Sequence, residues 1–137
     1  MGLTLTTHDT GFDDPDPGTI AKVLASLDGG RNVLATLGHS DLVYLQASGS
    51  VQKGFTLEYQ DGSLDQHYRS GATALPLDEA TVVFQKYARG DASWRDGIMW
   101  DREAFAAPRA AWSGTWIGFL ALLAFVIVLI WYWRGGG

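Results

Sequence analysis

The fold is decided by residues 54–69, GFTLEYQDGSLDQHYR. Apolar side chains recur at every second position in its first half, at Phe55, Leu57 and Tyr59. This period of two is typical of a strand with one face in a core and the other, here with Glu58, turned away. The Asp61-Gly62 pair is a strong hairpin signal, and residues 63–69 would form the returning strand. The stretch therefore predicts an antiparallel strand pair.

Further strands precede this pair along the chain. Residues 32–37 and 42–47 alternate in the same way and flank the short connection GHSD, which extends the pair into a four-stranded meander. Residues 3–7, LTLTT, predict one more short strand with Leu3 and Leu5 on its core face.

Two helices are predicted, one before and one after the meander along the sequence. The first runs from Pro17 to about Leu27 with Asp16 as its N-cap, and its apolar stripe is Ile20, Val23, Leu24 and Leu27. The second opens at residues 76–79, with Asp78 as N-cap, and runs to about Arg89 before Gly90. Its expected buried residues are Ala80, Val83, Phe84 and Tyr87.

The expected fold class is α+β, an antiparallel β-meander with two packing helices, followed by one C-terminal transmembrane helix. The order β-α-β-β-β-β-α has more strands than crossover helices, which favours an antiparallel sheet over a doubly wound parallel one. An irregular segment with a short strand around residues 98–100 follows the second helix. We expect the α+β domain to occupy residues 1–103.

The transmembrane helix is predicted from residues 110–133, AAWSGTWIGFLALLAFVIVLIWYW, which are 24 residues without a charge. At about 1.5 Å per residue, a helix of this length spans about 36 Å and exceeds the roughly 30 Å hydrocarbon core of a bilayer. A helix buried in a protein core would usually be shorter. We therefore expect a span at 111–134 and a juxtamembrane linker at 104–110.

Aromatic residues mark both ends of the expected span, as they do at membrane interfaces. These residues are Trp112, Trp116, Trp131, Tyr132 and Trp133. Arg95, Arg102 and Arg109 precede the span and only Arg134 follows it, so the positive-inside rule places the N-terminal domain in the cytoplasm. The first residues lack the pattern of a signal peptide, and we expect a tail-anchored, single-pass protein.

Small residues lie on one side of the expected span, at Gly114, Gly118 and Ala121. The GxxxG spacing allows another helix to approach closely, which predicts helix packing there. The alternative is that small residues are simply common in membrane helices. The span contains no ionisable residue, so we expect no proton relay or histidine-ligated cofactor on it.

Composition excludes several classes of function. The chain has 137 residues, no cysteine and a formal net charge of −5, so disulfide scaffolds, cysteine zinc sites and thiol nucleophiles are excluded. The 15 acidic and nine basic residues before residue 110 give that part a net charge of −6. Since the basic residues do not cluster, we expect no nucleic-acid partner.

Two groups of residues could carry chemistry, and each has a simpler interpretation. Residues 8–16 hold a histidine and four aspartates, which are candidate ligands for Ca²⁺ or Mg²⁺. They lack the EF-hand spacing, and a helix cap with a solvated turn explains them equally well.

The histidines are the other candidates. His39 or His67 could pair with Asp41, Glu58 or Asp65 for acid–base catalysis, but nothing in the sequence positions them. The common hydrolase and nucleotide-binding motifs are absent. We expect no catalytic, metal-binding or cofactor-binding residue.

Tryptophan and arginine recur together before the expected span, in Ser93-Trp94-Arg95 and Trp100-Asp101-Arg102. This pairing is typical of anchors at protein interfaces. The candidate partner-contact residues are therefore Trp94, Arg95, Trp100 and Arg102. The alternative is that both tryptophans close the domain's own core or rest among lipid headgroups.

Residues from about 24 to 100 resemble small bacterial Imm1-like immunity domains, through LDGGRNVLATLG, LVYLQASG, GFTLEYQDGSLDQHYR and PLDEATVVFQKYARGDASW. The resemblance lies in the order of elements and carries no catalytic motif. It implies a domain that binds a partner protein and is not an enzyme. The C-terminal anchor departs from that family's pattern, and the scaffold could equally serve as a tethered docking module.

Two main hypotheses follow from the sequence, and a third, an enzyme, rests only on His8, His39 and His67 with nearby acidic residues. The first is a non-enzymatic accessory subunit of a larger membrane complex of respiratory, photosynthetic or transport type, in a bacterial inner or intracytoplasmic membrane. It would contact other subunits through its span and juxtamembrane tryptophans, and it would contact the lipid bilayer. The second is a membrane-tethered immunity protein that neutralises a toxin domain.

Overall fold

The computed structural model of the protein describes residues 2–71 and 73–103, all within one compact unit, Met1–Phe105. Along the chain the elements are β1 (Thr4–Thr6), β2 (Gly11–Asp13), α1 (Pro17–Ala25), β3 (Leu34–Ser40), β4 (Val43–Ser50), β5 (Gly54–Asp61), β6 (His67–Ser70), α2 (Leu77–Ala88), the 3-10 helix η1 (Ala92–Arg95) and β7 (Trp100–Arg102).

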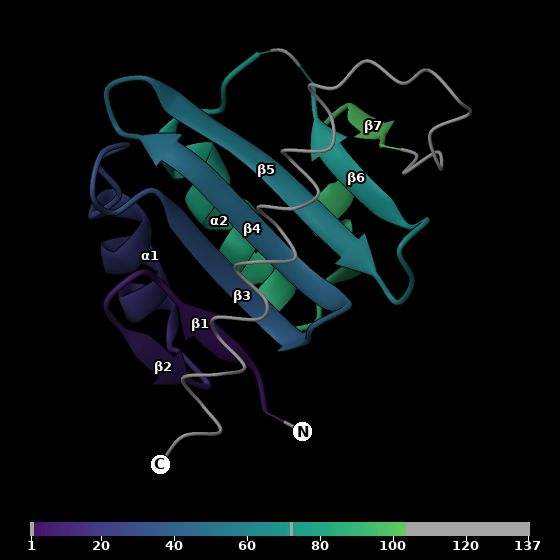
Figure 1. The fold of residues 1–137 in the computed structure, drawn as a ribbon, viewed down its shortest axis with the longest axis horizontal. Helices are drawn as coiled ribbons and strands as arrows, with labels where there is room; N and C mark the ends of the chain where they lie inside the picture. The colour runs from purple at the N-terminus through teal and green to yellow at the C-terminus, as the bar shows by residue number, and fades with distance from the viewer. Residues whose placement is uncertain (1, 72, 104–137) are drawn as a thin grey trace, which may run out of the picture. The chain divides into compact units, whose positions relative to one another are not determined.

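The strands form one antiparallel sheet in the order β2-β1-β3-β4-β5-β6-β7. Both helices lie behind this sheet in the view of Figure 1, so α1 and α2 cover the same face. We call that face the inner face and the opposite one the outer face. The α+β class, with an antiparallel meander and two packing helices, is thus confirmed.

The core lies between the inner face and the helices. β5 contributes Phe55, Leu57 and Tyr59, the alternate residues predicted from the sequence, and all three are buried. The predicted helix stripes are also largely confirmed: Ile20, Val23 and Leu24 of α1 and Ala80, Val83 and Phe84 of α2 are buried. Burial of this apolar surface is the main stabilising contribution to the domain.

The connection between β5 and β6 differs from the prediction. The predicted two-residue turn at Asp61-Gly62, with a returning strand from residue 63, is wrong, because β6 begins only at His67. The Asp61 amide donates to the Gln66 carbonyl at 3.0 Å, and the Gln66 amide donates to the Ser63 carbonyl at 3.1 Å. A second turn, at residues 63–66, thus follows Asp61-Gly62. The longer connection shifts the register, so that Gln60 pairs with His67.

The helix ends are partly as predicted. Asp16 caps α1 through a 2.7 Å bond from the Thr19 amide to its carboxylate, which confirms the predicted N-cap. The predicted cap at Asp78 is wrong, since α2 begins at Leu77 and its N-cap is Pro76 without a side-chain bond. The proline ring holds φ at −68°, which is compatible with a helix start.

Several short elements also differ. β2 and η1 were not predicted, and the short strand lies at residues 100–102, not 98–100. β3 runs on to Ser40, so His39 lies in a strand and not in a turn. α1 ends at Ala25, although Leu27 beyond it is still buried.

No helix within residues 2–71 and 73–103 is long and apolar enough to cross a membrane. The expected span at 111–134 and the linker at 104–110 lie outside the described residues. The same holds for the predicted packing residues Gly114, Gly118 and Ala121, and for the predicted interface residues Trp112, Trp116, Trp131, Tyr132 and Trp133.

Candidate functional site

Five aromatic rings pack together where β5, β6 and β7 meet α2 and η1. We call them the aromatic cluster: Tyr59, Tyr68, Tyr87, Trp94 and Trp100. The Tyr59 ring stacks on Tyr68 with centroids 4.7 Å apart and meets Trp94 and Trp100 edge-on at 4.9 and 4.8 Å. Tyr87 meets Trp94 edge-on at 5.2 Å. Such pairs add stability beyond the area they bury, so the cluster is a well-packed unit.

Arg95 lies over this cluster. Its Cζ atom is 5.1 Å from the centroid of the Trp94 ring and 5.6 Å from that of Tyr59, within the range of cation–π attraction. Its Nη1 atom also lies 3.9 Å from a carboxylate oxygen of Asp61. The guanidinium is therefore oriented by two rings and a carboxylate while its side chain remains half exposed.

Burial in the cluster raises the pKa of Tyr59 above its ordinary value, because removal from water disfavours the charged phenolate. Arg95 opposes this shift by hydrogen bonding to the phenol and by its positive charge. The pKa of Tyr87 is likewise raised, chiefly by burial. Both side chains therefore stay neutral at physiological pH, and their rings pack against Trp94.

The four candidate partner-contact residues fall into two groups. Trp94 is only 8% exposed and belongs to the core, as the alternative interpretation from the sequence allowed. Trp100 is partly buried, and its indole Nε1 donates to the Arg95 carbonyl at 3.1 Å. Arg102 is exposed, and its Nε donates to the Asp65 carbonyl at 2.9 Å. Of the four candidates, the ones with accessible surface are thus Arg95, Trp100 and Arg102. Their contact with a partner stays a prediction.

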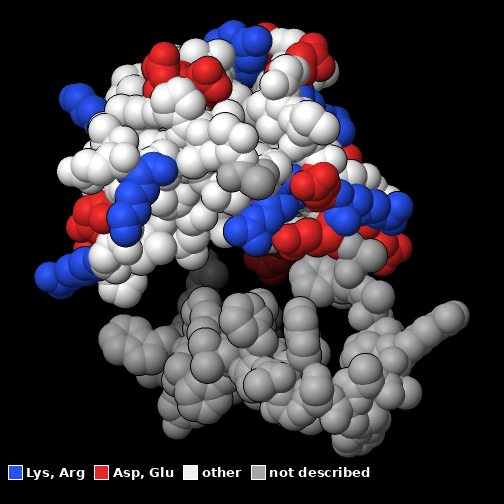
Figure 2. Space-filling model, turned by 90° about the horizontal axis from the view of Figure 1, so that it is seen from above, with Lys and Arg blue, Asp and Glu red and all other residues white. Residues whose placement is uncertain are grey.

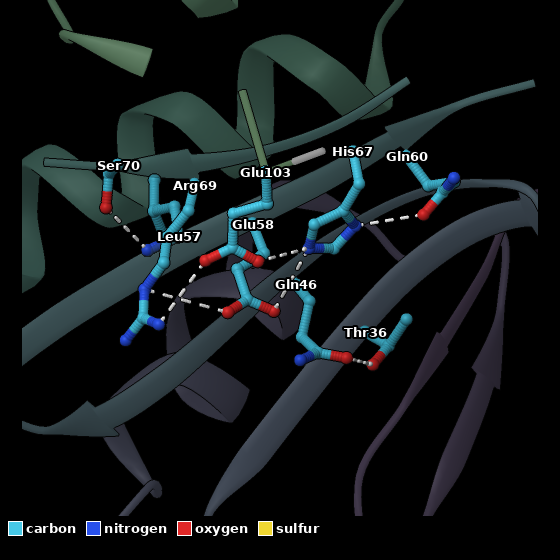
Figure 3. Close-up of polar contacts among 9 residues, drawn as sticks. All are labelled: Thr36, Gln46, Leu57, Glu58, Gln60, His67, Arg69, Ser70 and Glu103. Atoms are coloured by element: carbon cyan, nitrogen blue, oxygen red, sulfur yellow. Dashed lines mark hydrogen bonds and ion pairs between the residues drawn. The ribbon is translucent and has the colours of Figure 1, made fainter. Parts of the chain in front are cut away.

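A second cluster lies on the outer face, and Figure 3 shows its members. We call it the polar cluster: Glu58, Gln60, His67, Arg69 and Glu103. The register of β5 and β6 places Gln60 opposite His67 and Glu58 opposite Arg69. The Glu103 amide donates to the His67 carbonyl at 3.0 Å, which brings Glu103 beside them.

The buried His67 ring is oriented by its neighbours. Its Nδ1 lies 2.9 Å from the Gln60 Oε1, and the amide nitrogen of Gln60 donates to the Ser63 carbonyl. Because Gln60 thereby turns its oxygen toward the ring, Nδ1 is the donor in this bond. The Nε2 atom lies 3.8 Å from a carboxylate oxygen of Glu58 and 3.5 Å from one of Glu103.

Arg69 joins the same two carboxylates from the other side. Its Nε lies 3.8 Å from Glu58 and its Nη1 lies 3.6 Å from Glu103 (Figure 3). Each glutamate therefore faces both an arginine and an imidazole. This network connects β5 and β6 to Glu103, the last residue described before the expected linker.

The histidines and acidic residues considered from the sequence are only partly brought together. Glu58 does contact His67, whereas His39 lies against Tyr87 at a centroid distance of 6.1 Å and His8 pairs with Asp9 at 3.8 Å. His39 lies in β3 and His67 in β6, whereas His8 lies in the turn between β1 and β2. Within residues 2–71 and 73–103, no group of three or more histidine and acidic side chains is arranged to hold a metal ion.

The acidic residues near the N-terminus serve the local backbone. The Leu3 amide donates to the Asp14 carboxylate at 3.0 Å, and the Asp14 amide donates to the Leu3 carbonyl at 2.7 Å. Asp16 caps α1, and hydrogen bonds from Thr19 lower the pKa of its carboxyl group. The structure therefore gives these carboxylates turn-forming and capping roles.

A groove of about 380 Å³ beside β1 and β3 is lined by three threonines, His8, Arg31 and two apolar residues at the start of β3. All of these side chains are exposed or half exposed. No buried polar side chain of the described residues lines this groove, so we assign no ligand to it.

Sequence reasoning assigned Tyr59 and Tyr87 to the core and singled out Trp94 and Trp100 as candidate contacts, but it missed the contribution of Tyr68 to the aromatic cluster. A two-residue turn at Asp61-Gly62 would place Gln60 opposite Ser63, whereas the observed register places Tyr59 opposite Tyr68. The polar cluster was missed for the same reason.

Comparison of the chain with family models, with curated proteins and with solved structures gives no match.

Proposed function

We propose that the protein is a non-enzymatic, single-span membrane protein and that its α+β domain docks on a larger membrane assembly as an accessory subunit. The observation that carries this proposal is Arg95 lying on the aromatic cluster, in the segment just before the uncharged residues 110–133. Complexes of respiratory, photosynthetic or transport type are suitable hosts.

The aromatic cluster has the chemistry of an interface anchor. Interface hot spots are enriched in tryptophan, tyrosine and arginine, and they work best when the free protein already holds them in place. Arg95 and the partly buried Trp100 meet this condition, because both rest on the buried Trp94 and Tyr59. A partner would therefore meet a preformed surface and would lose little conformational entropy on binding.

The environment of His67 supports a non-enzymatic role. Its Nδ1 bonds to Gln60, and its Nε2 faces two carboxylates that also face Arg69. A general base needs a ring nitrogen within reach of a substrate proton. Here the described neighbours of both nitrogens are protein groups that hold the sheet together.

The surface charge supports a protein or lipid partner over a nucleic acid. On the face shown in Figure 2, acidic and basic side chains are interspersed and form no extended basic patch. Together with the net charge of −5, this distribution gives no electrostatic attraction for a phosphate backbone.

The alternative, a membrane-tethered immunity protein, is favoured by the outer face of the sheet. Neither described helix covers this face, and it carries the polar cluster together with Thr36 and Gln46, whose side chains bond at 3.2 Å (Figure 3). An acidic domain with a polar sheet face suits capture of a basic toxin domain. A toxin encoded beside this gene would then lose its lethality when this protein is present.

The docking proposal is tested by solubilising membranes in mild detergent and identifying proteins that copurify with the tagged full chain. We expect a stoichiometric membrane partner with the wild type and a weakened association with Arg95→Ala. Lys53→Ala is the matched control, because it removes an exposed cation from the distant β4–β5 turn. A lone protein without any stoichiometric partner contradicts the proposal.

A further inference from the structure

One end of the sheet carries both the exit of the chain and two exposed leucines. The β3–β4 turn and the β5–β6 connection lie at the end where the β3 and β5 arrowheads point in Figure 1. Glu103 lies at the same end, because its amide bonds to His67, the first residue of β6. The chain therefore leaves the described domain beside these two connections.

Each connection exposes a leucine. Leu42 in the β3–β4 turn is 39% exposed, and Leu64 in the β5–β6 connection is 64% exposed. Turns usually carry small polar residues, so leucines at both tips need an explanation. The two connections are also joined, because the Gly62 amide donates to the Leu42 carbonyl at 2.7 Å.

Two arginines lie beside acidic residues at this end. Asp61 lies beside Arg95, and Arg102 donates to the backbone carbonyl of Asp65. A zwitterionic lipid surface carries no net charge, so apolar contact by the exposed leucines, and not the charge of this end, would determine binding there.

The length of the chain beyond Glu103 brings this end close to a bilayer. If the span begins at residue 111, the seven residues 104–110 reach at most about 25 Å when fully extended. Such a short tether gives an effective concentration in the millimolar range, so even a weak surface contact is populated.

We propose, resting on the single span of the proposed function, that Leu42 and Leu64 insert into the lipid headgroup region and seat this end of the sheet on the membrane surface. The domain then lies with β3–β4 and β5–β6 toward the bilayer and the β4–β5 turn away from it. A fixed orientation of this kind presents Arg95 and Trp100 close to the membrane.

The absence of cysteine allows a direct test with single labels on the full chain. Leu64→Cys and Val51→Cys each receive an environment-sensitive fluorophore, and the proteins are reconstituted into phosphatidylcholine vesicles that contain a headgroup-attached quencher. Val51 is a matched control, because it is 49% exposed in the β4–β5 turn at the opposite end. Circular dichroism of each labelled protein checks that the domain is folded.

We expect several-fold stronger quenching at position 64 than at position 51, and a loss of that difference when Leu42→Glu is added to the position 64 variant. Equal quenching at both positions in a protein that resists alkaline extraction overturns the proposed orientation and leaves the span intact. Release of the protein by alkaline extraction instead contradicts the span, and the proposed orientation falls with it.

Discussion

Replacing Trp94 with alanine tests whether this side chain is core or contact surface. Trp94 is 8% exposed, and its ring meets Tyr59, Tyr87 and Trp100 edge-on and supports Arg95. Truncation of a buried tryptophan costs about 3–5 kcal/mol, because both the transfer free energy and the contacts around the new cavity are lost. That loss is a large part of the roughly 5–15 kcal/mol that stabilises a typical domain.

The expected result is a fall in the melting temperature on the order of 15–30 °C, since about 1 kcal/mol corresponds to roughly 4–8 °C in a domain of this size. Near-ultraviolet circular dichroism and pulse proteolysis of the detergent-solubilised full chain measure it. Met99→Ala is the matched control from the same segment, because Met99 is 84% exposed and its loss should cost less than about 0.5 kcal/mol. A Trp94→Ala protein as stable as Met99→Ala refutes the assignment of Trp94 to the core.

Three further predictions concern the backbone, the polar cluster and the helix cap. Gly49→Ala should destabilise the domain far more than Gly62→Ala, because a Cβ at Gly49 would clash with the Gly54 carbonyl oxygen, whereas no described residue other than the two chain neighbours of Gly62 lies within 4 Å of a Cβ there. For Gly62→Ala, thermal melts should show only the roughly 1–3 kcal/mol of backbone strain. His67→Ala should cost about 1–3 kcal/mol in urea unfolding, since it leaves the buried Gln60 without this hydrogen bond. Hydrogen bonding lowers the folded-state pKa of Asp16, so the contribution of its carboxylate to stability is fully present above pH 3.8 and is lost as pH falls below that value. As the pH is lowered over this range, the melting temperature of Asp16→Asn should therefore fall less than that of the wild type.

The parts of the fold that were predicted correctly rest on local signals. In β5 the period of two assigned Phe55, Leu57 and Tyr59 to the core, because one face of the strand is buried and the other is not. The Asp16 cap was predicted because a carboxylate before a proline-initiated helix meets free backbone amides. Such signals depend on residues only a few positions apart.

The parts that were missed depend on contacts between distant residues. β2 has a single apolar side chain, Phe12, and forms because Asp14 bonds twice with Leu3 across the hairpin. The polar cluster depends on the register of β5 against β6, which the Gln60 bond to Ser63 and the second turn determine. A strong Asp-Gly turn signal predicted a different register, and every cross-strand pair changed with it.

The central claim, that this chain works as a single-span subunit of a larger assembly, is tested most directly by the mass of the native particle. Membranes are extracted in mild detergent, and light scattering on a size-exclusion column gives the protein mass without the bound detergent. The account predicts a particle well above the 14.9 kDa of this chain, with a second membrane protein in fixed ratio. A particle of 14.9 kDa that contains this chain alone would contradict it.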